Sequence, residues 1–213
     1  MVLVLSTILA VVIGYLLGSI PFAYIAARLK KGVDIRQVGS GNTGALNTMR
    51  EVGPAIGFAV LFADIAKGSL AVLIAQWLGL SLIWVFVVGF VAVVGHNWPI
   101  FLKFKGGKGI ATTLGVLLIL VPREFGISFA IIVIIVIITS NIRLGAGIGL
   151  AFLPLIVWQF GGSGMLIAYS LALPLFCGVR SLTEIKRAAV SSDSRKGFIF
   201  DREYHFWQAR KRK

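Results

Sequence analysis

Long apolar segments separated by short polar ones run through most of the chain. They cover residues 3–27, 54–77, 82–102, 109–121, 125–140, 144–160 and 164–179, approximately. A membrane-spanning helix needs about 20 mostly apolar residues. The first three segments reach this length, and the other four are shorter. The pattern predicts an all-α integral membrane protein with about seven transmembrane helices, several of them short.

Composition supports this class, because 58% of the residues are hydrophobic and the mean hydropathy is +0.94. Soluble domains contain about 45–50% apolar residues. The segment at 109–121 is the shortest and ends before Pro122. It is either a short or tilted span, or a helix that enters a protein-filled interior.

The basic residues indicate an orientation. All but two of the 21 Lys and Arg residues lie in 28–50, in 103–108, at Arg143 or after residue 179. If the chain crosses the membrane seven times, these four regions lie on the same side. Positive residues favour the cytoplasmic side, so we expect an outside N-terminus and a cytoplasmic C-terminus. The net charge of +13 is mainly this orientation signal, with attraction to anionic lipid as a second effect, and it does not require nucleic acid.

We expect a single transmembrane helical domain over 1–179 and a basic cytoplasmic tail over 180–213. Cytoplasmic substrate loops are predicted at 28–53 and 103–113. Aromatic residues alternate with charges in the tail, so part of it is a candidate amphipathic element on the bilayer.

The first glycine loop, residues 39–44, contains Gly39, Gly41 and Gly44. Closely spaced glycines allow backbone N–H groups to turn toward an anion, and a helix beginning near Gly44 would add its positive N-terminal end. The spacing also fits the dinucleotide fingerprint. That interpretation fails because no strand precedes the loop.

Polar side chains in and after this loop suit a phosphate ligand. Ser40 and Asn42 can donate hydrogen bonds, and Arg50 offers a planar guanidinium that matches phosphate oxygens. Asn47 and Arg50 are three residues apart, so a helix presents them on one face.

The second glycine loop, residues 103–113, combines Gly106, Gly107 and Gly109 with the cations Lys105 and Lys108. It lacks the Walker spacing, so it is not a P-loop. One such cluster alone is more often a turn. Two cationic glycine loops on the same side of the membrane favour a shared anion site.

Three other ionisable residues stand near or within the spans. His96 lies near the cytoplasmic end of the third span, and we assign it to positioning the loop. Asp64 and Lys67 are one helical turn apart within a span, where they either neutralise each other or also support the phosphate site. We find no pattern of metal ligands and expect no cofactor.

These motifs, together with Gly18-Ser19-Ile20, Gly95-His96 to Pro99, Ala111-Thr112 and the Asp64–Gly68 segment, resemble the bacterial acyl-phosphate:glycerol-3-phosphate acyltransferase family (PlsY). The resemblance implies an enzyme of the bacterial inner membrane whose active site faces the cytoplasm. Its members transfer a fatty acyl group from acyl phosphate to the sn-1 hydroxyl of glycerol 3-phosphate, giving 1-acylglycerol 3-phosphate, or lysophosphatidic acid, for phospholipid biosynthesis.

By this resemblance Ser40, Arg50 and Lys108 would be catalytic. The substrate-binding residues would be Gly39, Gly41, Asn42, Gly44, Asn47, His96, Lys105, Gly106, Gly107, Gly109, Thr112 and Arg187. No protein nucleophile is evident, so we expect the substrate hydroxyl to attack directly, its proton passing to a phosphate oxygen.

The third family motif departs from its usual form. Ser181 stands where the family has histidine, and Glu184 replaces asparagine, while Ile185 and Arg187 fit. A negative charge is unfavourable near a phosphate dianion. A paralogue with another polyol-phosphate acceptor or weakened catalysis is therefore one alternative, and a transporter of phosphorylated metabolites is another. His205, farther along the tail, is a candidate replacement imidazole.

Overall fold

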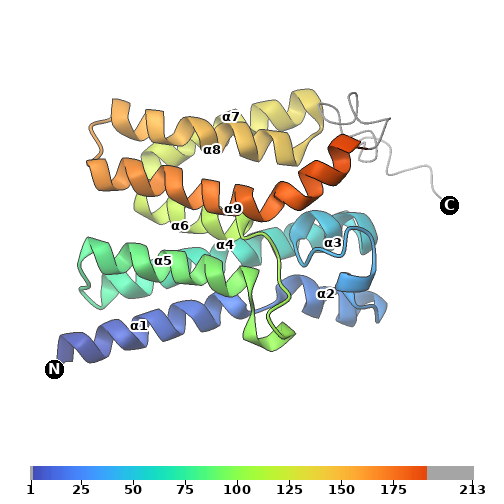
Figure 1. Cartoon of the computed structure of the whole chain (residues 1–213), viewed down its shortest axis with the longest axis horizontal. Helices are drawn as coiled ribbons and strands as arrows, with labels where there is room; N and C mark the ends of the chain where they lie inside the picture. Colours follow the sequence, from blue (N-terminus) through green and yellow to red (C-terminus); the bar gives the residue numbers. More distant parts are fainter. Residues whose placement is uncertain (1, 191–213) are drawn as a thin grey trace. The chain divides into compact units, whose positions relative to one another are not determined.

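The computed structural model describes the backbone of residues 2–190 and the side chains of residues 3–182. Within this range the chain forms helices joined by loops, with no strand. The helices are α1 Val2–Ser19, α2 Phe22–Lys31, η1 Ile35–Gln37, α3 Ala45–Glu51, α4 Pro54–Trp77, α5 Leu82–Asn97, η2 Ile100–Leu102, α6 Ile110–Leu120, α7 Pro122–Thr139, α8 Ile142–Gln159 and α9 Gly164–Val190 (Figure 1).

Six segments in the described range are long and apolar enough to cross a membrane, and α6 is a shorter apolar helix of 11 residues. Together they match the apolar segments predicted from the sequence. The all-α integral membrane fold is therefore confirmed, and α6 is the short helix that the hydropathy pattern indicated before Pro122.

The first span differs from the expected continuous helix over 3–27, because it is interrupted between Ser19 and Phe22. Proline disfavours the helical conformation in the preceding residue, here Ile20, and has no N–H to continue the hydrogen-bond ladder. The carbonyl oxygen of Ile20, which lies outside the helical hydrogen-bond ladder, accepts a hydrogen bond from Lys67 Nζ at 2.9 Å. The interruption thus places a backbone oxygen beside a buried cation of α4.

The residues up to Leu120 form one compact unit and those from Val121 a second. In the first unit, α1 packs on α5 and α4 packs on α6 (Figure 1). A Cβ atom at Gly18 of α1 would collide with the Ala92 backbone, and one at Gly115 of α6 with the Ile65 backbone. Small residues thus allow these membrane helices to approach closely.

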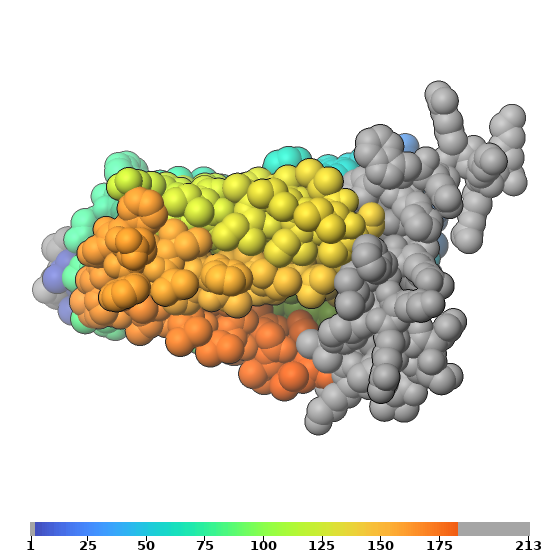
Figure 2. All heavy atoms as spheres, turned by 90° about the horizontal axis from the view of Figure 1, so that it is seen from above, coloured from blue at the N-terminus to red at the C-terminus, as the bar shows by residue number. Residues whose placement is uncertain are grey.

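The second unit is built from α7, α8 and α9, with α8 packed against both of the others. Asn141 caps α8 through its side-chain oxygen, and Ser128 Oγ of α7 donates to the Gly149 carbonyl at 2.7 Å. Figure 2 shows the side chains of these helices as spheres. Large apolar residues of this unit such as Ile137 and Phe152 are exposed, as expected for a lipid-facing surface.

Candidate active site

The first glycine loop is fixed by the side chain of Asn47. The Asn47 amide nitrogen donates to the carbonyl oxygens of Ile35 at 3.2 Å and Val38 at 3.1 Å, and its oxygen accepts from the Ser40 N–H at 3.0 Å. Asn47 is buried on α3, which begins after Gly44 as the sequence predicted. These bonds support the loop backbone, which makes Asn47 a positioning residue.

Asp34 and Arg36 form an ion pair just before the first glycine loop. The Asp34 carboxylate caps η1 and accepts from Arg36 Nε at 3.0 Å and from its terminal nitrogen at 2.7 Å. These hydrogen bonds from Arg36 lower the pKa of Asp34 to about 2, against the opposing effect of burial. Arg36 also lies over the Tyr24 ring and donates to the Leu102 carbonyl at 3.4 Å, which links the short helices η1 and η2 that precede the two loops.

The second glycine loop rests on the end of α5 through its backbone. The Gly106 N–H donates to the Asn97 carbonyl at 3.2 Å, and the Gly107 N–H donates to the His96 carbonyl at 3.1 Å. A Cβ atom at Gly106 would collide with the His96 carbonyl oxygen. This part of the loop therefore requires glycine because two backbones touch there.

The two loops meet at Gly107. A Cβ atom at this position would collide with His96 Nε2 and would lie 3.0 Å from the Thr43 carbonyl oxygen. Thr43 belongs to the first glycine loop and Gly107 to the second. The structure thus brings together two motifs that are more than 60 residues apart, with the His96 ring against their junction.

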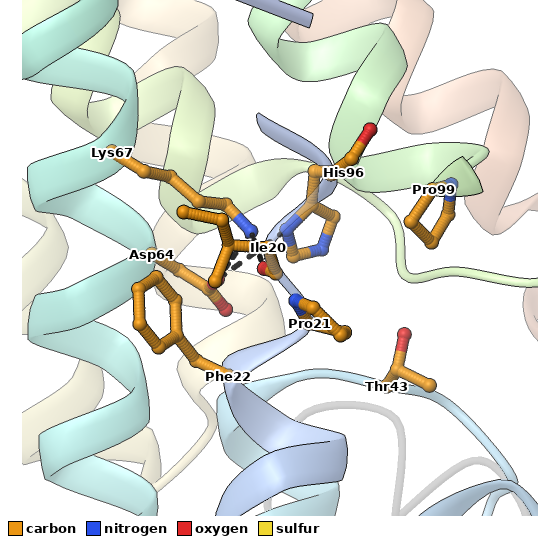
Figure 3. Close-up of a pocket in the computed structure, with 9 residues that line it drawn as sticks. Ile20, Pro21, Phe22, Thr43, Asp64, Lys67, His96 and Pro99 are labelled. Carbon is orange, nitrogen blue, oxygen red and sulfur yellow. Dashed lines mark hydrogen bonds and ion pairs between the residues drawn. The ribbon is translucent and has the colours of Figure 1, made fainter. Parts of the chain in front are cut away.

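A buried ionic cluster lies beneath the loops. Lys67 Nζ is 2.7 Å from Asp64 Oδ1, and His96 Nδ1 is 3.5 Å from the same oxygen (Figure 3). The exposed fractions of Asp64, Lys67 and His96 are 1%, 3% and 7%. The Asp64–Lys67 ion pair proposed from the sequence is present, and His96 completes a cluster that the sequence did not reveal, because Asp64 and His96 belong to different helices.

The other predicted site residues occupy varied environments. Ser40 and Lys105 are exposed, Asn42, Arg50 and Lys108 are half-buried, and Gly39, Gly41 and Gly109 have positive φ angles. Thr112 is buried in α6, where its backbone and methyl group pack against Gly68 of α4. The roles assigned to these residues stay predictions.

The altered third motif begins in α9. Ser181 Oγ donates within this helix to the Cys177 carbonyl at 3.1 Å. The side chains of Glu184 and Arg187, and all of His205, lie outside the part of the chain whose side chains the structure describes. Within the described residues, no group of three His, Cys, Asp or Glu side chains is arranged to hold a metal ion.

Comparisons with known proteins agree on one family. The glycerol-3-phosphate acyltransferase family model matches residues 8–190. Glycerol-3-phosphate acyltransferase 1 of Dehalococcoides mccartyi is 42% identical over 91% of this chain and 96% of its own. Glycerol-3-phosphate acyltransferase 2 of Moorella thermoacetica is 40% identical over 89% of this chain and 97% of its own.

Two crystal structures share the fold. The glycerol 3-phosphate form of PlsY (YgiH), an integral membrane glycerol 3-phosphate acyltransferase, has a TM-score of 0.80 and is 34% identical, covering 86% of this chain and 92% of that one. Its lysophosphatidic acid form has a TM-score of 0.77 at 33% identity, with the same coverage. With its membrane-spanning helices and paired glycine loops, the chain belongs to the glycerol-3-phosphate acyltransferase family and is a multi-pass membrane acyltransferase.

Proposed function

We propose that this protein transfers a fatty acyl group from acyl phosphate to the sn-1 hydroxyl of glycerol 3-phosphate. The products are 1-acylglycerol 3-phosphate and inorganic phosphate. The reaction takes place at the cytoplasmic face of the bacterial inner membrane, the side to which the distribution of basic residues assigns both glycine loops.

The observation that carries this proposal is the meeting of the two glycine loops at Gly107 and Thr43. Both substrates are phosphate anions that repel each other, so the enzyme has to hold two anionic groups close together. Each loop supplies glycines and a nearby cation, Arg50 after the first loop and Lys108 in the second. A pair of joined loops suits a reaction between two phosphorylated substrates.

In the proposed mechanism the acceptor hydroxyl attacks the acyl carbonyl carbon directly. A carbon–oxygen bond to glycerol forms, the bond to the phosphate oxygen breaks, and the hydroxyl proton passes to a phosphate oxygen. Ser40, Arg50 and Lys108 orient the phosphates and stabilise the developing charge. The glycine residues of both loops, with Asn42, Lys105, Thr112 and Arg187, complete the substrate contacts, while Asn47 and His96 hold the loops in place.

Detergent-purified protein incubated with acyl phosphate and a panel of polyol phosphates tests both the activity and the acceptor. Mass spectrometry should detect 1-acylglycerol 3-phosphate when glycerol 3-phosphate is present. A preference for a different polyol phosphate would identify a paralogue, for which Glu184 is the sequence signal. Flux of the phosphate compound into liposomes without any acylated product would instead support a transporter.

Arg50→Ala and Lys108→Ala should each lower kcat/KM on the order of 100-fold, because each removes a charged group that contacts the reacting phosphates. The matched control is Lys103→Ala, which removes an exposed cation of the second loop to which no substrate contact is assigned. Its kcat/KM should stay within about twofold, since surface charges are screened. Near-normal turnover in either test variant would remove its assigned role, and a trapped acyl-enzyme would refute direct attack.

A further inference from the structure

A small pocket lies beside the buried ionic cluster, where the interruption of the first span, the first glycine loop and the end of α5 come together (Figure 3). Its walls include Ser19 at the end of α1, Asp64 of α4, His96 of α5, Thr43 of the first glycine loop and Pro99. All of these residues belong to the first compact unit. The empty volume is about 180 Å³ with the open mouth included, and the polar interior has room for one small group.

The pocket contains hydrogen-bonding groups that the protein itself leaves unused. Ser19 is fully buried, and its hydroxyl has no hydrogen-bond partner among the described residues. His96 Nδ1 stands 3.5 Å from Asp64 Oδ1, which is long for a hydrogen bond. Because buried polar groups nearly always have partners, such groups around one pocket suit it to binding a polar group.

The charges around the pocket select the chemistry of that ligand. The Lys67 ammonium already contacts the Asp64 carboxylate and the Ile20 carbonyl, so its charge is largely compensated. The Asp64 carboxylate would repel a phosphate group. A neutral hydroxyl fits instead, since it can donate to the carboxylate and also accept a hydrogen bond from Ser19.

The position of the pocket relates this hydroxyl to the acceptor. Thr43 connects its wall to the first glycine loop, and the opposite edge of the His96 ring touches Gly107 of the second. An acceptor held by its phosphate at these loops can extend a short carbon chain into the pocket. The reacting hydroxyl must stay against the acyl carbon, and the pocket has no room for both, so the remaining hydroxyl of glycerol 3-phosphate is the group that fits.

We propose that the pocket formed by Ser19, Asp64 and His96 binds the non-reacting middle hydroxyl of the acceptor and thereby selects a glycerol phosphate. This inference rests on the proposed function and adds a specificity site to it. Lys67 and Ile20 act indirectly by holding the Asp64 carboxylate in place. The hydroxyl bound in the pocket belongs either to the acceptor or to a water molecule, and a comparison of two acceptors distinguishes them.

The experiment compares glycerol 3-phosphate with 3-hydroxypropyl phosphate, which retains the reacting hydroxyl and lacks the middle one. With acyl phosphate as donor, the wild-type kcat/KM should be at least about 30-fold higher for glycerol 3-phosphate, because the analogue without the middle hydroxyl leaves buried polar groups unpaired. In Ser19→Ala this ratio should fall to about fivefold or less, mainly through loss of kcat/KM for glycerol 3-phosphate.

Two further variants control for structural effects. Ser19→Cys keeps nearly the same shape with a weak hydrogen-bonding thiol, and it should lower the ratio as well. Ser128→Ala removes another fully buried serine hydroxyl, on α7 and outside the pocket wall. Ser128→Ala should lower thermal stability in detergent while it leaves the wild-type ratio in place.

The outcomes distinguish the two proposals. A wild-type enzyme that acylates both acceptors equally well overturns the specificity pocket while the acyltransferase function stands. The same conclusion follows if the ratio is unchanged in both Ser19 variants and only their stability falls, which identifies the ligand as a structural water. Failure of the wild-type protein to acylate either acceptor overturns the proposed function and this inference with it.

Discussion

The two glycine loops are held in different ways. The first loop depends on side chains. The Asn47 side chain donates two hydrogen bonds and accepts one, and an Asp34–Arg36 ion pair lies just before the loop. The second depends on direct contact between backbones, with Gly106 and Gly107 donating to carbonyl oxygens at the end of α5. A loop held by side chains can lose its bonds one at a time. A loop held by backbone contact is displaced by any added side chain.

The largest effect is expected from Gly106→Ala in the second loop. The new Cβ atom would collide with the His96 carbonyl oxygen and the Pro99 ring, neither of which is a flexible side-chain end. A displacement of about 1 Å lowers catalysis on the order of 100-fold, so kcat/KM measured with purified enzyme should fall by this amount.

Gly126→Ala is the matched control, because a Cβ atom at this position in α7 meets no atom within 4 Å. Its activity should stay within about twofold of wild type, and its helix should gain slightly in stability. Equal activity of Gly106→Ala and Gly126→Ala would show that backbone contact does not determine the position of the second loop.

An intermediate effect is expected from Asn47→Ala in the first loop. The change removes the partner of the Ile35 carbonyl and of the Ser40 N–H, at a cost of about 1–3 kcal/mol. The Val38 carbonyl loses one of its two donors and keeps the Gly41 N–H at 3.0 Å. We expect kcat/KM to fall about tenfold, and hydrogen exchange at the Ser40 amide to become faster. Asn47→Asp keeps the oxygen that accepts from the Ser40 N–H but loses both donated bonds, so exchange at Ser40 should be slower than in Asn47→Ala and faster than in wild type. An unchanged exchange rate in Asn47→Ala would contradict the assigned role.

The smallest effect is expected from Asp34→Asn, because the Arg36 partner is partly exposed and surface ion pairs contribute about 0–1 kcal/mol. The pKa of Asp34 is about 2 in the folded protein and about 3.8 otherwise. The charged carboxylate therefore stabilises the fold fully above pH 3.8, and this contribution disappears as the pH falls through 2.

Thermal stability in detergent, measured from pH 6 to pH 2, checks this prediction. Wild type should be slightly more stable than Asp34→Asn near pH 6, and the difference should narrow below pH 4. A difference that widens toward low pH would reverse the sign of the proposed linkage and exclude the Asp34–Arg36 ion pair as its source.

The membrane fold could be predicted from the sequence because hydropathy acts over whole segments. About 20 apolar residues define a span whichever neighbours it packs against. Even the short α6 was visible as an apolar segment ended by Pro122. The interruption of the first span was missed although Ile20-Pro21 carries its signal, because apolar residues continue on both sides.

The site was predicted in part. Glycine and basic residues marked both loops, and their shared side suggested a common anion site. The grouping of Asp64, Lys67 and His96 was not predicted beyond the helical pair. Ser19 was noted only as part of the Gly18-Ser19-Ile20 segment that resembles the family, with no chemical role. A serine inside an apolar segment gives no sign of whether its hydroxyl bonds its own helix or faces a pocket, since that depends on which helix packs beside it.

The sequence by itself determined that the chain is a bundle of membrane helices with two cationic glycine loops, because hydropathy and glycine content are local properties. Only the tertiary structure decided that Thr43 meets Gly107, that Asn47 fixes the first loop, and that His96 lies against Asp64. These contacts join residues of separate loops and helices. Their distances depend on how closely the helices pack, which the order of residues along the chain does not state.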